Sequence, residues 1–232
     1  MDSGRASAAG RGLILCHGDD GPAGLLGEWL TEHGCRYEVH DVTKRPVPAL
    51  GEVTFVASLG SEHSATDVDT PWVAQEIALL REAIGADVPV LGLCFGGQAL
   101  SIALGGEVVP AEKPQIGWFE LSEPAEGIPS GPWFHWHYEQ LSVPPGGAAL
   151  AHSEAGPAAF RHGRHVGLQF HPEVTLEVIA TWSRSEAALA KLGLSPEALR
   201  RESEMRAPLA RRHAWELFEL WWQGLTSGGA PA

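Results

Sequence analysis

The chain has 232 residues, 44% of them hydrophobic, which is enough to bury the core of one large α/β domain. Its formal net charge of −13 disfavours non-specific binding to nucleic acid or to an anionic membrane. Because no apolar run is long enough for a signal peptide or a membrane span, and three cysteines form no close pairing pattern, we predict a cytoplasmic protein with reduced thiols.

The chain shows no internal repeat, no low-complexity segment and no clear linker, so we predict a single domain over residues 1–232. Residues 1–11 are predicted to be a flexible lead-in. A helical C-terminal part of the same domain is expected at about 175–225, interrupted at Pro196 and Pro208.

Strand-like and helix-like stretches alternate through the first half of the chain. The helix predicted at 70–85 has Thr70 at its N-cap, Pro71 at its first position and Gly85 at its end. Such alternation predicts a doubly wound, mostly parallel sheet with helices on both faces. The expected strands are 12–18, 35–42, 53–58 and 88–93, and the other expected helices are 21–34 and 96–106.

The pattern changes at about Gly117 to short runs that alternate between apolar and polar residues. We expect these runs to be antiparallel strands added to the same sheet. They are GWFEL, WFHWH, LSV, AAFRHG and HVGLQF.

Cys94 lies in GLCFGG, where an apolar strand turns into a helix, with Gly92 two residues before it and Gly96 two after. This spacing is typical of a nucleophile elbow, because larger neighbours would clash with the strand or helix beside the turn. A helix N-terminus also favours the thiolate. A buried structural cysteine is the competing interpretation, and it is the one we adopt for Cys16 and Cys35.

A thiol nucleophile needs a base, and the base needs a group that orients it. His171 directly follows an alternating strand in HVGLQFHPEV, and Glu173 comes two residues later. Pro172 favours an extended backbone at the residue before it, in which residues i and i+2 can point the same way. Glu173 is therefore predicted to hold the imidazole of His171.

The motifs GLCFGGQ and QFHPE, with the helix PWVAQEIALLREAI, closely resemble those of the class I (triad) glutamine amidotransferases. The resemblance covers about residues 12–185. It implies a flavodoxin-like doubly wound fold and hydrolysis of the glutamine side-chain amide through a γ-glutamyl thioester. It also implies that Cys94 is the nucleophile, His171 the general acid/base and Glu173 its orienter.

The same resemblance implies the remaining site residues. Gln98 would contact the bound glutamine, and the N–H of Phe95 would donate to the oxyanion hole. The second oxyanion donor comes from a loop that is usually Gly-Gly-Pro; here VASLGSEHS offers Gly60, which we take as the donor.

Two stretches, 113–118 and 134–146, resemble the family segment that wraps the amino-acid end of the substrate. Backbone groups around Trp136 and Tyr138 are therefore candidate substrate contacts. The family often has an Asp near Glu139 and a small residue near Tyr138, and this chain departs from both.

Two other kinds of site are disfavoured. The alternating His135 and His137, and the neighbouring His162 and His165, lack the Cys-x-x-Cys or His-Glu-x-x-His spacing of a metal site. No phosphate-binding loop and no dinucleotide fingerprint occurs, so we expect no metal and no cofactor.

Trp215, Phe218 and Trp222 recur at helical spacing near the end of the chain. Such a stripe more often packs into a core than binds a partner. We therefore favour core packing and keep a partner-docking surface as the alternative.

The sequence thus predicts an amidase that releases glutamate and ammonia from glutamine. One alternative is a γ-glutamyl peptide or conjugate hydrolase with the same triad. A second alternative is a non-catalytic regulatory relative, which the intact Cys94, His171 and Glu173 argue against. An acceptor of the ammonia is expected on a separate synthase subunit.

Overall fold

The computed structural model describes residues 11–67, 69–185, 189–190 and 192–226. Most of the predicted lead-in, residues 1–10, lies outside this part, and Arg11 is already the first residue of β1. The strands are β1 (Arg11–Cys16), β2 (Tyr37–Asp41), β3 (Val53–Ser58), β4 (Val90–Leu93), β5 (Val108–Phe119), β6 (Trp133–Leu141), β7 (Ala148–Ser153), β8 (Gly156–His162) and β9 (His165–Leu168). The helices are α1 (Gly24–Glu32), α2 (Pro71–Gly85), α3 (Phe95–Ala103), α4 (Leu176–Trp182) and α6 (Pro196–Thr226).

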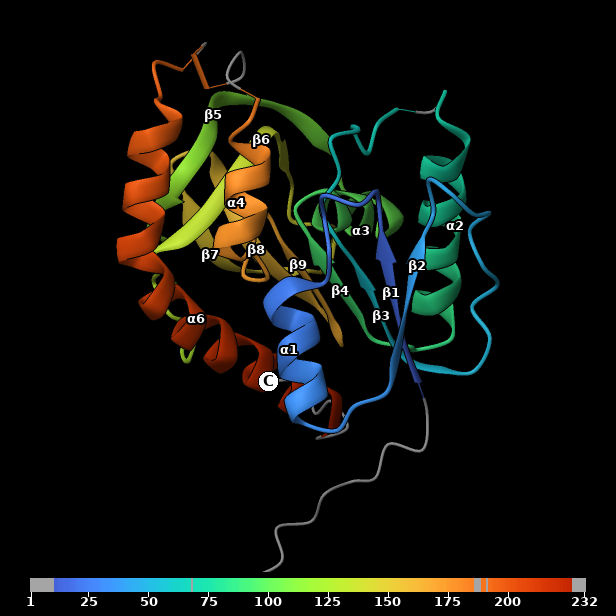
Figure 1. Cartoon of the computed structure of the whole chain (residues 1–232). Helices are drawn as coiled ribbons and strands as arrows, with labels where there is room; N and C mark the ends of the chain where they lie inside the picture. Colours follow the sequence, from blue (N-terminus) through green and yellow to red (C-terminus); the bar gives the residue numbers. More distant parts are fainter. Residues whose placement is uncertain (1–10, 68, 186–188, 191, 227–232) are drawn as a thin grey trace, which may run out of the picture.

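The main sheet has the strand order β2-β1-β3-β4-β9-β8-β7. The pairs from β2 through β9 are parallel, whereas β8 and β7 are added in antiparallel orientation. Figure 1 shows the sheet in the middle of the molecule, with helices in front of it and behind it. This mixed α/β architecture confirms the predicted doubly wound fold.

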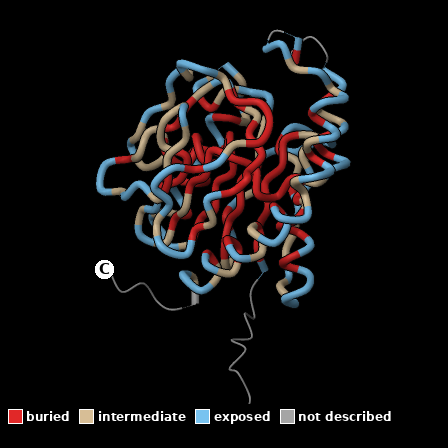
Figure 2. Tube along the Cα trace, turned by 90° about the vertical axis from the view of Figure 1, so that its left-hand side faces the viewer, coloured by how far each residue is buried: buried red, intermediate tan, exposed pale blue. Residues whose placement is uncertain are grey.

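The two faces of the sheet pack against different helices, because successive side chains along each strand point to opposite faces. On β1, Leu13 and Leu15 pack with residues of α2 and α3, whereas Ile14 and Cys16 pack with residues of α1 and the second half of α6. Figure 2 shows the resulting buried interior, with exposed segments around it. The sheet is therefore covered on both sides.

The structure corrects the prediction for the short alternating runs. β5 and β6 form a separate two-stranded antiparallel sheet, and β9 pairs with β4 in parallel. Alternation shows that one strand face is buried but carries no information about strand direction or partner. Pro110 and Pro114 lie within β5, and a residue without an N–H is unsuited to a central strand.

The C-terminal part is mostly helical where the structure describes it, and the non-helical residues 192–195 come just before Pro196, but the predicted interruption at Pro208 is wrong. Pro196 is the first residue of α6, where its missing N–H costs no helical bond, and α6 continues through Pro208. Figure 1 shows that α6 changes direction along its length. Burial of Phe218 and neighbouring apolar residues against α1 and the sheet offsets the bond that Pro208 lacks.

The aromatic stripe of α6 packs into the core, as favoured above. Phe218 is 1% exposed, and Trp215 and Trp222 pack against the same buried cluster. This inward face is unavailable as the alternative docking surface. Within the described residues, no helix combines the length and apolar character needed to cross a membrane.

Candidate active site

Adjacent parallel strands deliver the site residues to one edge of the sheet. Cys94 follows β4, His171 comes shortly after β9, and Gly60 comes shortly after β3. Because β3, β4 and β9 are neighbours in the sheet and run the same way, their carboxyl ends meet. This is the edge at which open α/β folds bind their ligands.

The turn at Cys94 has the geometry of a nucleophile elbow. Cys94 has φ 52° and ψ −106°, a conformation that L-residues rarely adopt and that costs about 1–3 kcal/mol. A Cβ at Gly92 would lie 2.3 Å from the Gly96 carbonyl oxygen, and a Cβ at Gly96 would lie 2.0 Å from the Ser58 carbonyl oxygen. The glycine on each side is therefore a steric requirement of the turn.

His171 and Glu173 form the predicted pair. His171 Nδ1 donates to Glu173 Oε1 at 2.8 Å, and the two side chains are only 3% and 6% exposed. The backbone holds both residues, since the His171 N–H donates to the Phe134 carbonyl and the Glu173 carbonyl accepts from Leu25 N–H. The His171 ring is therefore fixed with its other nitrogen free for Cys94.

The charge on His171 follows from its neighbours. Burial alone would lower the pKa of His171, but the Glu173 carboxylate and the interaction with Cys94 outweigh burial and raise that pKa to about 10. The imidazole is therefore protonated at neutral pH. A protonated imidazole beside a sulfur is the arrangement that activates cysteine nucleophiles in general.

Gly60 lies against both His171 and Cys94. A Cβ built on Gly60 would be 2.8 Å from His171 Cε1 and 3.8 Å from Cys94 Cβ. Phe95, the first residue of α3, directly follows the nucleophile. The structure thus brings both candidate oxyanion residues to the sulfur.

The side-chain nitrogen of Gln98 bonds to protein groups. Gln98 is buried, and its amide nitrogen donates to the Glu139 carbonyl at 3.1 Å and to Gln169 Oε1 at 3.4 Å. This nitrogen supports β6 rather than facing an open substrate site. A direct contact of Gln98 with substrate stays a prediction.

Gln169 is a site residue that the sequence analysis missed. Its Nε2 lies 3.9 Å from Cys94 Sγ, and its Oε1 accepts from the Leu141 N–H at 3.0 Å. Gln169 is completely buried and precedes His171 by two residues, on the same side of an extended segment. This spacing of two residues from His171 is the sequence signal that could have identified Gln169.

Trp136, one of the two candidate substrate-contact residues on β6, lies at the sulfur. The Trp136 carbonyl oxygen is 3.7 Å from Cys94 Sγ. The Tyr138 side chain is 45% exposed, and the Glu139 carboxylate accepts from Ser64 Oγ at 2.9 Å. The backbone of β6, through Trp136, therefore forms one wall of the site.

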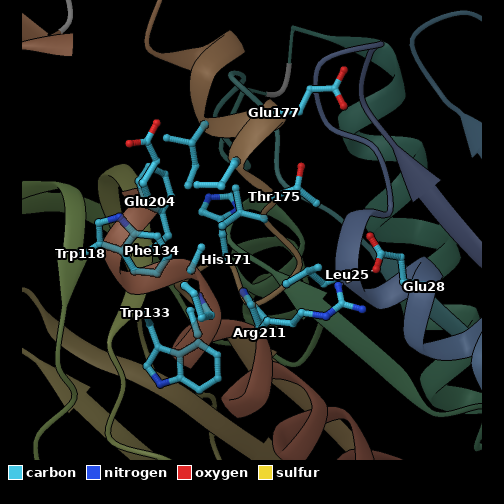
Figure 3. A pocket seen from close by; sticks show the side chains of 17 residues that line it. Leu25, Glu28, Trp118, Trp133, Phe134, His171, Thr175, Glu177, Glu204 and Arg211 are labelled. Atoms are coloured by element: carbon cyan, nitrogen blue, oxygen red, sulfur yellow. Dashed lines mark hydrogen bonds and ion pairs between the residues drawn. The ribbon is translucent and has the colours of Figure 1, made fainter. Parts of the chain in front are cut away.

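A cavity of about 460 Å³ lies next to the His171–Glu173 pair, between α4, α6 and the small sheet. Figure 3 shows His171 in the middle of its lining, with Trp133 and Phe134 on one side and Leu25 and Arg211 on the other. Cys94 is not among the lining residues. The cavity reaches the His171–Pro172 corner without reaching the nucleophile.

Three of the four histidines considered as metal ligands, namely His135, His137 and His165, are buried and neutral. Burial lowers the pKa of His137 to about 4 and lowers that of His135 well below its ordinary value. The two rings lie 3.2 Å apart, Nδ1 to Nε2, and His137 Nδ1 donates to the Glu139 carbonyl at 3.0 Å. Burial likewise lowers the pKa of His165 to about 4. Among the described residues, no cluster of three or more His, Cys, Asp or Glu could hold a metal ion.

The other two cysteines have a different environment. Burial raises the pKa of both Cys16 and Cys35, which keeps these thiols protonated and poorly nucleophilic. Cys16 directly precedes His17, but the two ring nitrogens of His17 bond to Glu76 and to the Gly60 carbonyl rather than to the Cys16 sulfur.

Comparison with known proteins agrees with this geometry. The family model "Glutamine amidotransferase class-I" matches residues 59–181. A glutamine-hydrolysing GMP synthase from Nitrosomonas eutropha is 33% identical over 182 residues, which cover 70% of this chain and 34% of that protein. A similar enzyme from Paraburkholderia phytofirmans is 37% identical over 134 residues, or 50% of this chain and 24% of that protein. The chain thus spans about a third or less of these relatives.

Solved structures agree over a larger part of the chain. A glutamine amidotransferase from Methylobacillus flagellatus has a TM-score of 0.84 and 27% identity, covering 97% of this chain and 99% of that one. A glutamine amidotransferase from Thermotoga maritima has a TM-score of 0.81 and 25% identity, covering 91% of this chain and 97% of that one.

Proposed function

This chain belongs to the class-I glutamine amidotransferase family, and on that premise we propose that it hydrolyses the side-chain amide of glutamine through a γ-glutamyl thioester on Cys94. The observation that carries the proposal is the buried His171, which contacts both Glu173 and Cys94 at the end of the elbow. A thiolate at that position needs no further base before it attacks.

The proposed reaction has two halves. The Cys94 sulfur forms a bond to the carboxamide carbon, the carbon–nitrogen bond breaks, and the His171 imidazolium gives its proton to the departing ammonia. His171, now neutral, then takes a proton from water, which attacks the thioester carbon. The carbon–sulfur bond breaks, and glutamate leaves with Cys94 restored as the thiolate.

The negative oxygen formed in each half needs hydrogen-bond donors. We assign these to the N–H groups of Gly60 and Phe95, because both residues adjoin the sulfur. Losing one such donor typically reduces kcat by about 10²–10³-fold. The Trp136 carbonyl at 3.7 Å from Sγ is the proposed backbone contact for the amino-acid end of the substrate.

A separate synthase subunit is the proposed recipient of the ammonia. Support comes from a relative in Ignicoccus hospitalis whose name describes one subunit of a glutamine-hydrolysing GMP synthase. It is 35% identical over 96 residues, covering 37% of this chain and 51% of that protein. Ammonia is neutral and small, so transfer within a complex would limit its loss to solvent. The purified chain is expected to release ammonia without consuming ATP.

The direct test is ammonia release from glutamine by the purified protein beside Cys94→Ala. The same assay uses a panel of γ-glutamyl dipeptides. Turnover of glutamine that Cys94→Ala abolishes supports the proposal. Turnover of the dipeptides alone would assign the γ-glutamyl hydrolase instead, and no turnover of either class would indicate the non-catalytic relative.

A second test identifies the nucleophile. A glutamine-mimicking electrophile is expected to label Cys94 and to leave Cys16 and Cys35 largely unmodified, as measured by peptide mapping. Cys94→Ala provides the control for background labelling. Predominant modification at Cys16 or Cys35 would refute the assignment.

A further inference from the structure

A second buried histidine–carboxylate pair lies behind the proposed oxyanion loop. His17, the residue after β1, has one ring nitrogen, Nε2, 2.9 Å from Glu76 Oε2 on α2 and the other, Nδ1, 2.9 Å from the Gly60 carbonyl oxygen. The side chains of His17 and Glu76 are both completely buried. Ser58 Oγ donates to the second carboxylate oxygen of Glu76 at 2.6 Å.

The partners of His17 determine where its protons lie. A carbonyl oxygen can only accept, so His17 Nδ1 carries a hydrogen and donates to Gly60. His17 Nε2 and Glu76 Oε2 then share one more proton between them, because two bare acceptors would repel each other. Burial disfavours the charged ring, but the Glu76 carboxylate outweighs burial and raises the pKa of His17. The pair therefore keeps the Nδ1–H aimed at Gly60.

The pair contacts both residues assigned to the oxyanion hole. Besides its bond to the Gly60 carbonyl, the His17 ring packs edge-on against the Phe95 ring, with centroids 4.7 Å apart. Its other side lies on Trp72, with centroids 5.0 Å apart. A displacement of His17 would therefore reach both N–H donors.

Two peptide planes of the loop are held by described hydrogen bonds. The Leu59 carbonyl accepts from the Gly96 N–H at 3.0 Å, and the Gly60 carbonyl accepts from His17. In a trans peptide the N–H points opposite to the carbonyl, so each bond also directs the N–H of the following residue. Within the described part of the chain, no acceptor is recorded for the N–H of Gly60 or Ser61, which leaves both N–H groups available.

We propose that His17 and Glu76 are a positioning pair that holds the loop at Gly60 in its catalytic orientation through the hydrogen bond from His17 to the Gly60 carbonyl. This inference rests on the proposed function of Gly60. His17 and Glu76 touch no reacting atom. Their bond to the Gly60 carbonyl orients the Gly60–Ser61 peptide, which adjoins the peptide that carries the Gly60 N–H, and the contact of the His17 ring with Phe95 positions that residue.

Two mild substitutions separate positioning from charge. In Glu76→Gln the amide nitrogen can donate to Nε2 of a neutral His17, and the amide oxygen still accepts from Ser58, so every hydrogen bond survives without the charge. In Glu76→Asp the charge survives, but the carboxylate retreats by about 1.5 Å, one carbon–carbon bond. Positioning predicts a kcat for Glu76→Gln within about threefold of wild type and a kcat for Glu76→Asp about tenfold lower, since the donor is misplaced rather than lost.

A stronger variant removes the pair as a unit. His17→Phe with Glu76→Met leaves no unpaired buried charge, which favours folding. We expect kcat to fall by about ten- to a hundredfold, with a smaller change in KM. The larger value is about the smallest loss of kcat seen when an oxyanion donor is removed altogether. Alkylation of Cys94 by iodoacetamide should keep its wild-type rate, because His171 and Glu173 are untouched. The matched control is His40→Gln, which removes another buried histidine that donates to a carbonyl, that of Pro46.

Amide hydrogen exchange tests the pair without substrate. The N–H groups of Leu59 and Gly96 are expected to exchange faster in Glu76→Asp and at the wild-type rate in Glu76→Gln. A higher kcat for Glu76→Asp than for Glu76→Gln would overturn positioning in favour of charge. Wild-type kcat and exchange in all folded variants would also overturn the proposal. Absence of turnover in the wild-type protein refutes the proposed function instead, and the exchange rates then decide this inference alone.

Discussion

Two buried histidine–carboxylate pairs lie at the same edge of the sheet, and they differ in the third group that each histidine contacts. His171 pairs with Glu173 at 2.8 Å and faces a thiol, whereas His17 pairs with Glu76 at 2.9 Å and faces a carbonyl oxygen. The carboxylate raises the histidine pKa in both pairs, against the effect of burial. The immediate electrostatics are therefore alike.

The third group decides what each pair can do. A thiol can lose its proton, so the His171 pair can hold a thiolate and later move a proton to and from the reacting atoms. A carbonyl has no proton to lose, so the His17 pair can only hold the peptide in place. The comparison teaches that a buried His–Glu pair becomes a catalytic or a positioning device through its neighbour, and the following predictions test this difference.

The largest expected effect comes from His171→Ala. This change removes the group that carries the proton, and a loss of about 10⁶-fold in kcat is known for deletion of a triad histidine. The measurement is kcat for glutamine hydrolysis, set beside the His17→Phe/Glu76→Met variant. An equal loss of kcat in the two variants would contradict the distinction between a catalytic His171 pair and a positioning His17 pair.

Glu173→Gln is expected to leave more activity than His171→Ala, because the amide can still hold the ring while its charge is lost. The loss should not exceed the roughly 10⁴-fold seen for the equivalent change in serine-protease triads. The charge of Glu173 also supports the raised His171 pKa of about 10, so wild-type kcat/KM should fall only as the pH rises toward 10. In Glu173→Gln this fall of kcat/KM at alkaline pH should move to lower pH. An unchanged pH dependence of kcat/KM would contradict the role assigned to Glu173.

Gly60→Ala tests the loop where the two pairs meet. The new Cβ would lie 2.8 Å from His171 Cε1, so either the ring or the loop must shift. We expect kcat to fall by about 10–10²-fold, whereas full loss of an oxyanion donor can lower kcat by up to about 10³-fold. Gly85→Ala is the matched control, because a Cβ there meets no atom within 4 Å. Equal kcat values for the two variants would remove Gly60 from the site.

The pH dependence of stability should also distinguish the wild type from Glu173→Gln. A histidine pKa raised by folding stabilises the protein fully below its unfolded value of about 6.5. That contribution is lost as the pH rises through the folded value, about 10 for His171. The free energy of unfolding in urea should therefore decline from pH 7 to 10 in the wild type and less steeply in Glu173→Gln. Identical slopes would argue against the raised pKa.

The smallest expected effect is on the stability of the His17→Phe/Glu76→Met variant. The cost of burying two charges largely cancels their attraction, so replacing the pair with apolar residues of similar size should change the free energy of unfolding by only about 2 kcal/mol in either direction. The matched comparison is Glu76→Met alone, which leaves His17 buried without its carboxylate. A greater loss of stability in the double variant than in Glu76→Met alone would make the pair primarily structural.

The elbow and the His171 pair could be predicted because they depend on residues close in sequence. Gly92 and Gly96 flank Cys94 by two positions; the clash that excludes a larger residue at Gly92 lies within the same turn, whereas the clash at Gly96 is with Ser58 on the neighbouring strand β3. Glu173 reaches His171 from two residues away. Alternation and helical periodicity likewise predicted the parallel half of the sheet, because each pattern follows from the geometry of one element.

Other features depended on contacts between distant segments, which no local pattern records. The separate β5–β6 sheet and the parallel pairing of β9 are set by which strand edges meet, and the continuity of α6 through Pro208 by packing on α1 and the sheet. Gln169 reaches Cys94 across 75 residues, and His17 reaches Glu76 across 59. The sequence alone predicted Cys94 as the nucleophile and His171 as its base. Only the tertiary structure, through the order of β1, β3, β4 and β9 and the packing of α2 behind them, placed the second buried pair, His17 and Glu76, beneath Gly60. The reason is that hydrogen bonds form between neighbours in space, whatever their separation along the chain.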